Sequence, residues 1–431
     1  MSSAGQREAL GRELYELVRE LYPICRSITG DGVRETLQRV SRVVPLERHD
    51  VPSGTQVLDW TVPDEWNVRD AWIKNLAGER VVDFRRHNLH LVSYSEPVAP
   101  RRISRAELVE HLHSLPAHPD WIPYRTSYYQ RTWGFCVSHK QLESLVDPEY
   151  EVCVDTRLAP GALSYGECFL PGERDDEILF SAHVCHPSLC NDNLSGIAVA
   201  AAVARALAAR TARRFSYRFL FIPGTIGSIT WLARNRERAA RIRGGLTLVC
   251  LGDARGFTYK KSFNGDAPID RAAALALAGQ PFEAIDFFPY GYDERQFNSP
   301  GFRIPVGSLM RGRHGRFDAY HTSADSLELV QAPQLAAAVD AVLAIVDVLE
   351  GDARVRSLAP YGEPQLGRRG IYRALGGESD PEALQLAMLW VLSLADGEHT
   401  LVDAAERSGI PFATIRSAAT LLERHALIEA S

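Results

Sequence analysis

The chain has 431 residues, of which 45% are hydrophobic, so it is long enough for two or three domains around at least one large core. Acidic residues outnumber basic residues by 54 to 48, and the formal net charge of −6 argues against nucleic-acid binding as the main task of the surface. No stretch approaches the ~18 uninterrupted apolar residues of a membrane span, so we expect no segment that crosses a membrane.

Residues 1 to about 45 have the apolar spacing of amphipathic helices, and we expect residues 1–48 to form the N-terminal helical part of the main domain. This beginning lacks the apolar segment of a signal peptide, which makes the cytoplasm the expected compartment. The seven cysteines are odd in number and irregular in spacing, as expected for reduced, mostly buried thiols rather than for disulfides.

From residue 51 to about residue 100 the hydrophobic pattern changes to a period of two, with many aromatic and β-branched residues. The pattern predicts a small inserted β-rich domain, which we place at residues 49–125. The proline- and aromatic-rich passage at residues 114–135 carries too many large rings for a disordered linker, so we expect packed loop there.

Strand and helix patterns alternate from about Glu149 to Glu350, within a main domain that we place at residues 126–355. The predicted strands are "EILFSAHV", "SYRFLFIP", "LTLVCLGD" and "IPVGSL", and helices follow Ser195 and Gly227. Because near-continuous apolar strands separated by helices are buried on both faces, the predicted fold class is α/β, with a largely parallel sheet sandwiched by helices. In such sheets ligands bind at the carboxyl ends of the strands.

A stretch rich in glycine, proline and arginine leads to a last unit, which we place at residues 375–431. Its sequence "TLVDAAERSGIPFATIRSAATLLERHALIE" predicts helix, tight turn at Ser408-Gly409 and helix, as in a winged helix-turn-helix domain. From Pro381 onward the chain has three arginines, no lysine and seven acidic residues, so repulsion from phosphates favours a contact within the chain or a dimer contact over DNA binding.

Four polar residues follow predicted strands or lie in a later loop and are candidate metal ligands: His183, Asp192, Asp253 and His321. Imidazole and carboxylate groups together suit zinc or a similar divalent ion. Each residue also has an ordinary structural interpretation, since Asp192 can cap a helix, Asp253 can form a turn, and a histidine after a strand is often a hydrogen-bonded packing residue. The spacing alone leaves both interpretations open.

Three further residues are candidates for substrate contact. Arg295, in "YGYDERQFNSPG", can clamp a substrate carboxylate with two hydrogen bonds or can pair with an acid inside a solvated loop. Tyr165, in "LSYGE", and Tyr320, beside the candidate ligand histidine in "YHTSAD", can contact substrate or serve as packing residues.

The segments "SAHVCHPSLCNDNLSG", "FIPGTIGS", "CLGD" and "YHTSAD", in this order, resemble the co-catalytic zinc aminopeptidases of the aminopeptidase Y and glutamate carboxypeptidase type. More closely, the chain resembles an aminopeptidase-like branch with an inserted β-domain and a C-terminal winged helix, found near polysaccharide and natural-product biosynthesis genes. Further matches such as "ICRSITGDGVRETL" and "DERQFNSPGF" extend the resemblance to nearly the whole chain. The resemblance implies a mixed, largely parallel sheet of the zinc aminopeptidase kind.

The resemblance also implies ligand roles. His183 would bind the first zinc ion, and Asp253 would complete that site. Asp192 would bridge two zinc ions, with a cis peptide bond between it and Asn193. His321 would bind the second zinc ion. It further implies that Cys185, His186 and Asn193 surround the ligands rather than bind metal. Where Cys185 stands, the broader family usually has an acid that orients the ligand histidine.

The largest departure from the family lies in the triplet Pro223-Gly224-Thr225, at the end of the next predicted strand. Related enzymes have two adjacent glutamates there, one as general base and one as ligand of the second zinc. No acidic residue occurs between Tyr217 and Arg236, so no small shift of the alignment restores the carboxylate at Gly224. We therefore expect one tight zinc site and a second that is weak or absent, with Glu294 and Glu167 as candidate replacement bases.

The predicted function is that of a zinc-dependent, aminopeptidase-like hydrolase acting on a peptide or amide bond of a small aminoacyl or peptidyl substrate in a biosynthetic pathway. The alternatives are an impaired pseudo-peptidase that binds an intermediate or a partner protein, and a metal-assisted biosynthetic enzyme that does not hydrolyse its substrate. We expect no nucleic-acid or membrane partner, and a homo-oligomer, if one forms, through the C-terminal or the inserted domain.

Overall fold

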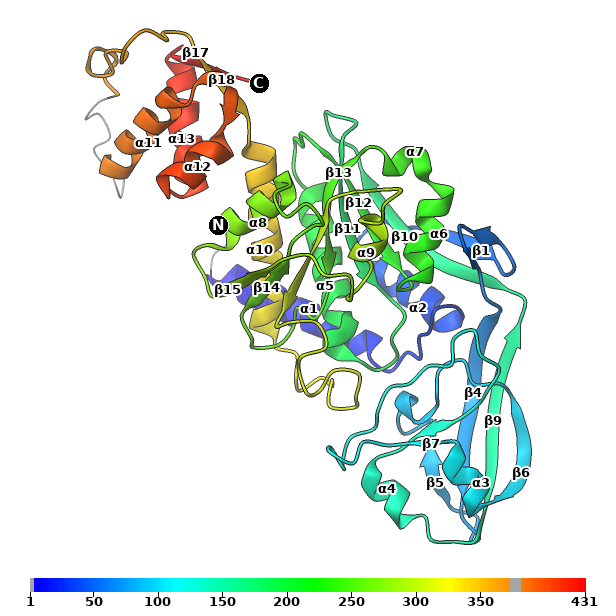
Figure 1. Ribbon diagram of the computed structural model, residues 1–431. Helices are drawn as coiled ribbons and strands as arrows, with labels where there is room; N and C mark the ends of the chain where they lie inside the picture. Colours follow the sequence, from blue (N-terminus) through cyan, green and yellow to red (C-terminus); the bar gives the residue numbers. More distant parts are fainter. Residues whose placement is uncertain (1–3, 372–380) are drawn as a thin grey trace. The chain divides into compact units, whose positions relative to one another are not determined.

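The computed structural model describes residues 4–371 and 381–431 and divides into two compact units (Figure 1). The first unit runs to Asn264 and resumes from Glu283 to Val339. The second unit combines Gly265–Phe282 with Asp340–Ser431. The units are considered one at a time below.

The first unit is built on an eight-stranded mixed sheet. Its strands, in spatial order, are β1 (Glu47–Pro52), β10 (Ala162–Leu170), β12 (Ser216–Ile222), β11 (Glu177–His183), β13 (Ile242–Leu248), β16 (Val306–Arg311), β14 (Phe257–Lys260) and β15 (Phe282–Ile285). The four central strands are parallel, whereas β1, β10 and β14 pair in antiparallel fashion. The predicted α/β fold with a mixed, largely parallel sheet is confirmed, and the four predicted strands are its four parallel ones.

Helices pack on this sheet at the places that the sequence indicates. Outside the inserted domain, the helices of the first unit are α1 (Ala4–Leu21), α2 (Asp31–Val40), α5 (Gly196–Ala208), α6 (Ile226–Arg234), α7 (Arg236–Ala239), α9 (Glu294–Phe297) and the start of α10 (Ala332–Gly351). The apolar helix α5 is buried on almost every side, because it lies against β11 and β13 and is covered by α1. All seven cysteines are free thiols and six of them are buried, in line with the sequence.

Among the described residues, α10 is the one helix that is long and apolar enough to cross a membrane by length and composition. Of the 18-residue apolar stretch within this helix, 56% is buried inside the structure. Core helices meet the same criteria, so this finding is weak evidence for a membrane span.

The inserted domain contains a four-stranded antiparallel sheet. Its order is β5 (Arg80–Asp83), β4 (Glu65–Lys74), β9 (Glu149–Ala159) and β6 (Val98–Ser104), accompanied by β2 (Gln56–Val57), β3 (Trp60–Thr61), β7 (Leu112–His113), β8 (Phe135–Cys136), α3 (Arg105–Glu110) and α4 (His139–Ser144). The sheet extends beyond the predicted range 49–125, because β9 pairs with β4 along nearly its whole length. A period of two identifies a strand but does not identify its partner.

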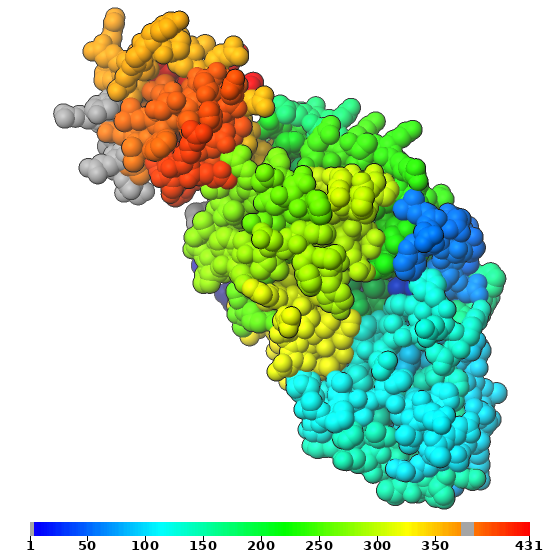
Figure 2. Space-filling model, viewed as in Figure 1, coloured from blue at the N-terminus to red at the C-terminus, as the bar shows by residue number. Residues whose placement is uncertain are grey.

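Besides the two chain connections, the inserted domain also contacts a later segment of the main domain. Pro123 forms an isolated β-bridge with Thr322, and Figure 2 shows the cyan atoms of the insert packed directly against the yellow atoms of that later segment. The segment 114–135, predicted to be a packed loop, therefore contacts the main domain.

The second unit contains α8 (Pro268–Leu277), α11 (Pro381–Ser393), α12 (Leu401–Ser408), α13 (Phe412–Arg424) and a three-stranded sheet of β18 (Asp396–Thr400), β17 (Arg354–Ser357) and β19 (Ile428–Ala430). The predicted tight turn is present, since Gly409 ends α12 with a φ of 69°, the left-handed conformation that glycine tolerates best. The predicted start of this domain at residue 375 lies outside the described residues. The middle strand β17 comes before it in the chain.

A buried ionic cluster ties three strands of the main sheet together. Arg218 on β12 binds Glu177 on β11 through two hydrogen bonds of 2.6 and 2.8 Å and also pairs with Glu167 on β10. The other oxygen of Glu167 accepts a 2.8 Å hydrogen bond from the indole of Trp231. The ionic side chains are about 95% buried, and Arg218 is the charge partner of both carboxylates, although Glu167 also lies 3.7 Å from the half-exposed Arg238.

We expect Arg218→Ala to lower the thermal stability strongly, because it leaves Glu177 buried without its cation and Glu167 with the 3.7 Å contact to Arg238, a loss of about 3–5 kcal/mol in comparable sites. A matched control is Arg205→Ala, which removes a largely exposed pair with Glu13 and is expected to cost at most about 1 kcal/mol. Differential scanning calorimetry of the two variants checks the contrast. Equal melting temperatures would show that the buried cluster contributes no more than a surface pair.

The C-terminal unit is not expected to bind duplex DNA at ~0.15 M salt, since even non-specific binding depends on several cationic contacts to phosphates. Fluorescence anisotropy of a labelled duplex titrated with the full chain measures this. Binding that weakens steeply as salt is added would contradict the prediction and assign a nucleic-acid partner to the winged helix.

Candidate functional site

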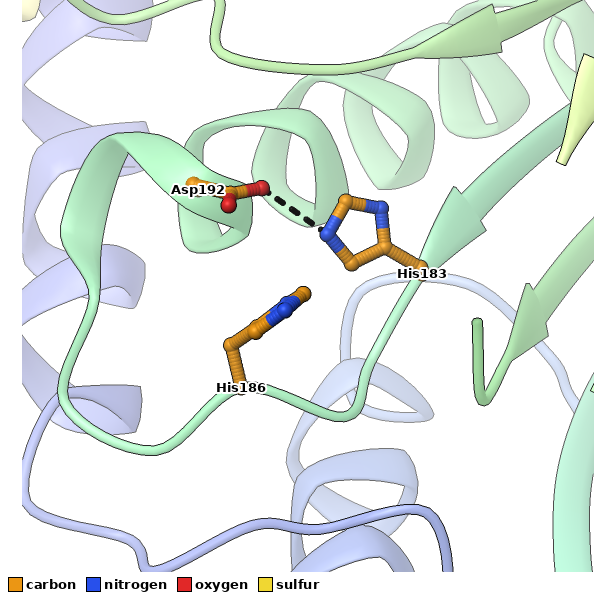
Figure 3. A group of neighbouring side chains, drawn as sticks. All are labelled: His183, His186 and Asp192. Carbon is orange, nitrogen blue, oxygen red and sulfur yellow. Dashed lines mark hydrogen bonds and ion pairs between the residues drawn. The ribbon is translucent and has the colours of Figure 1, made fainter. Parts of the chain in front are cut away.

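The candidate site begins where β11 ends. His183 is the last residue of β11, and Asp192 lies in the irregular helical segment Cys190–Ser195 that leads into α5. The Nε2 atom of His183 lies 2.9 Å from Oδ1 of Asp192 (Figure 3). The peptide bond between Asp192 and Asn193 is cis, as the resemblance implies.

The second oxygen of Asp192 faces another imidazole. Its Oδ2 atom lies 3.0 Å from Nε2 of His321. Both atoms are buried, and neither has a hydrogen-bond partner among the described residues. The carboxylate thus lies between two imidazole nitrogens, a donor set that suits zinc.

A third imidazole belongs to the same group. The ring of His186 lies 4.7 Å from that of His183 and 5.1 Å from that of His321, measured between ring centroids. Donor atoms of His183, His186 and Asp192 all lie within 4.8 Å of one another (Figure 3). Burial holds the pKa of His186 well below its ordinary value, which favours the neutral form that a metal ligand needs. His186, expected to surround the ligands, is therefore itself a candidate ligand.

The loop that carries Asp192 is fixed through its backbone. Asp325, which is fully buried, accepts hydrogen bonds from the backbone N–H groups of Asn191 at 2.6 Å and of Asp192 at 2.9 Å. The side chain of Asn193 donates to the Leu248 carbonyl at 3.0 Å and so ties the loop to the end of β13. Burial raises the pKa of Asp325 to about 7.

The start of α5 lies unusually close to the sheet. A Cβ atom added at Gly196 would lie 2.2 Å from the Leu248 carbonyl oxygen, so no other residue fits here without a shift of the backbone. This close approach brings the segment before the helix to the carboxyl ends of β11 and β13.

Asp253 lies one step away from this group. Its carboxylate accepts hydrogen bonds from the side chain of Asn191 at 2.7 Å and from the backbone of Arg255 at 2.8 Å, and it forms an ion pair with the Arg255 guanidinium. The structure therefore brings His183, Asp192 and His321 together and connects Asp253 to them through Asn191.

A cleft of about 230 Å³ is lined by the three imidazoles of His183, His186 and His321. Aromatic rings support the candidate ligands there: Tyr292 stacks on His183 at 5.1 Å, and Tyr320 stacks on His321 at 3.9 Å, between ring centroids. Arg295 also lines the cleft, and its Nε atom is buried without a hydrogen-bond partner among the described residues.

Two of the three residues predicted to contact substrate lie in the cleft, and the third does not. Arg295 and Tyr320 line the cleft. Tyr165 instead lies on β10, where its ring stacks on His49 of β1 at 4.9 Å. It is buried in the sheet and does not line the cleft.

Gly224 lies in the wall of the cleft, at the end of β12. Its N–H lies 3.2 Å from Sγ of Cys185, and a Cβ added to it would lie 3.3 Å from the same sulfur. Its φ is outside the left-handed region, so the backbone does not require glycine.

The two candidate replacement bases lie elsewhere. Glu294 is fully buried in an ion pair with Lys260 at 2.6 Å, and Glu167 belongs to the cluster around Arg218. Neither lines the cleft within the described part of the chain.

Asp293 is the cleft-lining carboxylate that the sequence did not single out. Its Oδ1 atom accepts hydrogen bonds from the backbone N–H of Thr225 at 2.6 Å and from the hydroxyl of Ser228 at 3.1 Å. Burial raises the pKa of Asp293 above its ordinary value. In the sequence it is one of three consecutive charged residues, a pattern that favours a solvated loop, and no local signal distinguishes it.

Comparison with known proteins supports the architecture. Residues 15–352 match a family described as "Domain of unknown function (DUF4910)", and residues 353–430 match a winged helix-turn-helix family. A protein of Clostridium acetobutylicum, named provisionally as a polysaccharide biosynthesis protein with an aminopeptidase-like domain, is 48% identical over 421 residues, which cover 97% of this chain and 96% of that protein.

Solved structures agree with these matches. A crystal structure from Clostridium acetobutylicum, named provisionally as a peptidase, has a TM-score of 0.94 at 45% identity and covers 99% of this chain and 98% of that chain. BSAP, a zinc aminopeptidase from Bacillus subtilis, has a TM-score of 0.57 at 14% identity and covers 78% and 94% of the two chains. The aminopeptidase-like fold and the C-terminal winged helix, both implied by the resemblance, are confirmed.

We expect Asp325→Ala to destabilise the segment that carries Asp192, because it leaves two buried N–H groups without an acceptor, at about 1–3 kcal/mol each. Asp325→Asn retains one carbonyl acceptor and should lose less. Thermal unfolding of both variants, with hydrogen exchange of the Asn191 and Asp192 amides, measures the effect. Wild-type melting and exchange protection in Asp325→Ala would contradict this account of the loop.

Proposed function

The chain belongs to the DUF4910 family, whose fold here is aminopeptidase-like, and on that premise we propose that its cleft binds zinc and hydrolyses a peptide or amide bond of a small aminoacyl or peptidyl substrate. The observation that carries the proposal is the position of Asp192, whose two oxygens lie about 3 Å from the Nε2 atoms of His183 and His321.

These residues fit a divalent metal. Asp192 Oδ2 and His321 Nε2 are buried and lie 3.0 Å apart, yet neither makes a hydrogen bond among the described residues, and burial of such atoms is costly unless something binds them. His183, Asp192 and His321 would hold the ion, and His186 offers a further nitrogen. A zinc ion at such a site polarises a carbonyl group and lowers the pKa of water.

The residues of the cleft suit a small substrate with a negative charge. The Arg295 guanidinium would bind a carboxylate of the substrate through paired hydrogen bonds, and its buried Nε supports this role since it has no acceptor of its own among the described residues. Tyr320, held flat against His321, would contact the substrate beside the reacting bond and keep that imidazole oriented.

The biological setting belongs to the proposal as well. The Clostridium acetobutylicum relative is named for polysaccharide biosynthesis, which supports a biosynthetic substrate. Seven free cysteines support a reducing compartment, and we therefore propose the cytoplasm. We propose no nucleic-acid or membrane partner, and a homo-oligomer, where one forms, through the C-terminal or inserted domain.

One observation favours a second candidate function. Gly224 leaves the end of β12 without a carboxylate, and loss of a general base costs about 10²–10⁴-fold in rate. A chain that binds metal and ligand in the same cleft but does not turn substrate over would then act as a binding protein. Turnover of a chromogenic aminoacyl anilide by the zinc-loaded chain distinguishes the two functions.

We expect about one tightly bound zinc per chain after dialysis, because a single group of candidate ligands converges on Asp192 and no glutamate among the described residues lines the cleft beside Gly224. His183→Ala should remove most of the metal, since this imidazole has no substitute on β11. Mass spectrometry of the metal content measures both, with His425→Ala, an exposed histidine of the second unit, as the matched control.

Two results would contradict this proposal. A zinc content near two per chain would require a further ligand in place of the missing carboxylate. A wild-type chain without bound metal after refolding in excess zinc would remove the basis for zinc-dependent hydrolysis.

A further inference from the structure

We propose that Asp293 is the proton acceptor for amide hydrolysis in this cleft, in place of the carboxylate that Gly224 lacks. The inference rests on the proposed function, because it names the residue that would take a proton from the attacking water. Asp293 is the carboxylate among the cleft-lining side chains that the structure describes, and it comes from a different element than the strand end.

The position of Asp293 follows from its neighbours. It precedes the short helix α9 and reaches the start of α6, where Thr225 and Ser228 donate to its Oδ1. Thr225 follows Gly224 directly, so the Asp293 carboxylate occupies the region at the end of β12. Asp293 and the candidate ligands His183 and His321 line the same cleft.

The two oxygens of Asp293 have different surroundings. Both hydrogen bonds to the carboxylate recorded within the described residues fall on Oδ1, which caps the first turn of α6. Oδ2 is the oxygen available to a molecule in the cleft. The next residue, Glu294, is held in its ion pair with Lys260, so this anchored pair fixes the loop from which Asp293 projects.

The proposed step balances in atoms and protons. The water oxygen forms a bond to the carbonyl carbon of the substrate while Asp293 Oδ2 takes one proton of that water. The C–N bond then breaks, and the proton passes from Asp293 to the leaving nitrogen. The products are a carboxylic acid and an amine, and Asp293 returns to its carboxylate form.

A structural role alone is the competing interpretation, since capping α6 would also explain the two hydrogen bonds. Asp293→Asn separates the roles, because the amide oxygen can still accept from Thr225 and Ser228 while the group no longer accepts a proton at neutral pH. Ser228→Ala is the matched control, since it removes one capping hydrogen bond and leaves the carboxylate in place.

The test measures kcat and KM on a chromogenic aminoacyl anilide, together with zinc content and melting temperature. We expect Asp293→Asn to lower kcat by about 10²–10⁴-fold, with KM, zinc content and melting temperature close to wild type. Ser228→Ala should lower kcat less than tenfold. In the Asp293→Asn background, Gly224→Glu should restore part of kcat, because the backbone at Gly224 accepts a side chain and the new carboxylate enters the same region.

Each contrary result has a distinct meaning. An active wild type with Asp293→Asn equally active overturns the inference and leaves the proposed function standing. Loss of zinc together with activity in Asp293→Asn overturns the proton-acceptor role and makes Asp293 a ligand. A zinc-loaded wild type that hydrolyses neither anilides nor dipeptides overturns the proposed function and this inference with it.

Discussion

The candidate site depends on one buried carboxylate, that of Asp192. A charged carboxylate without access to water is stable only when hydrogen bonds or positive charge compensate for the lost solvent. Burial raises the pKa of Asp192, but the three nearby imidazoles of His186, His183 and His321 outweigh burial and hold that pKa well below its ordinary value. The backbone around the carboxylate is in turn fixed by Asp325. Because these groups come from two separate segments of the chain, residues 183–192 and 321–325, the geometry of the cleft follows from the need to satisfy this one side chain.

The positions of His183 and Asp192 in the fold follow from local signals in the sequence. His183 closes a strand that is apolar throughout, and Asp192 precedes an apolar helix, so both positions can be placed from hydrophobic pattern alone. The four parallel strands are predicted for the same reason. The sequence does not predict the antiparallel strands β1, β10 and β14, because their partners lie far away in the chain, β1 is mostly exposed and β14 has four residues.

Other parts of the site could not be predicted, because they depend on the paths of loops. Asp293 meets Thr225 across 68 positions of sequence, and nothing in the triplet of charged residues distinguishes it from Glu294, which turns to Lys260 instead. The resemblance implies that His186 surrounds the ligands, and the structure packs its ring against the imidazoles of both candidate ligands, His183 and His321. Tyr165 is a candidate for substrate contact in the sequence, but its ring lies within the sheet against His49.

The inserted domain contributes to the site through the segment that carries His321. This residue has a φ of 55°, a left-handed conformation that is costly for a side chain with a Cβ and persists only where neighbours enforce it. Tyr124 of the insert donates its backbone N–H to the His321 carbonyl at 2.8 Å, and its ring lies edge-on against the imidazoles of His186 and His321. On the other side of the bridge, Ser323 binds the backbone of Ile122 in both directions. The main sheet therefore positions His183 and Asp192, whereas contacts with the insert hold the segment of the third member of the group, His321.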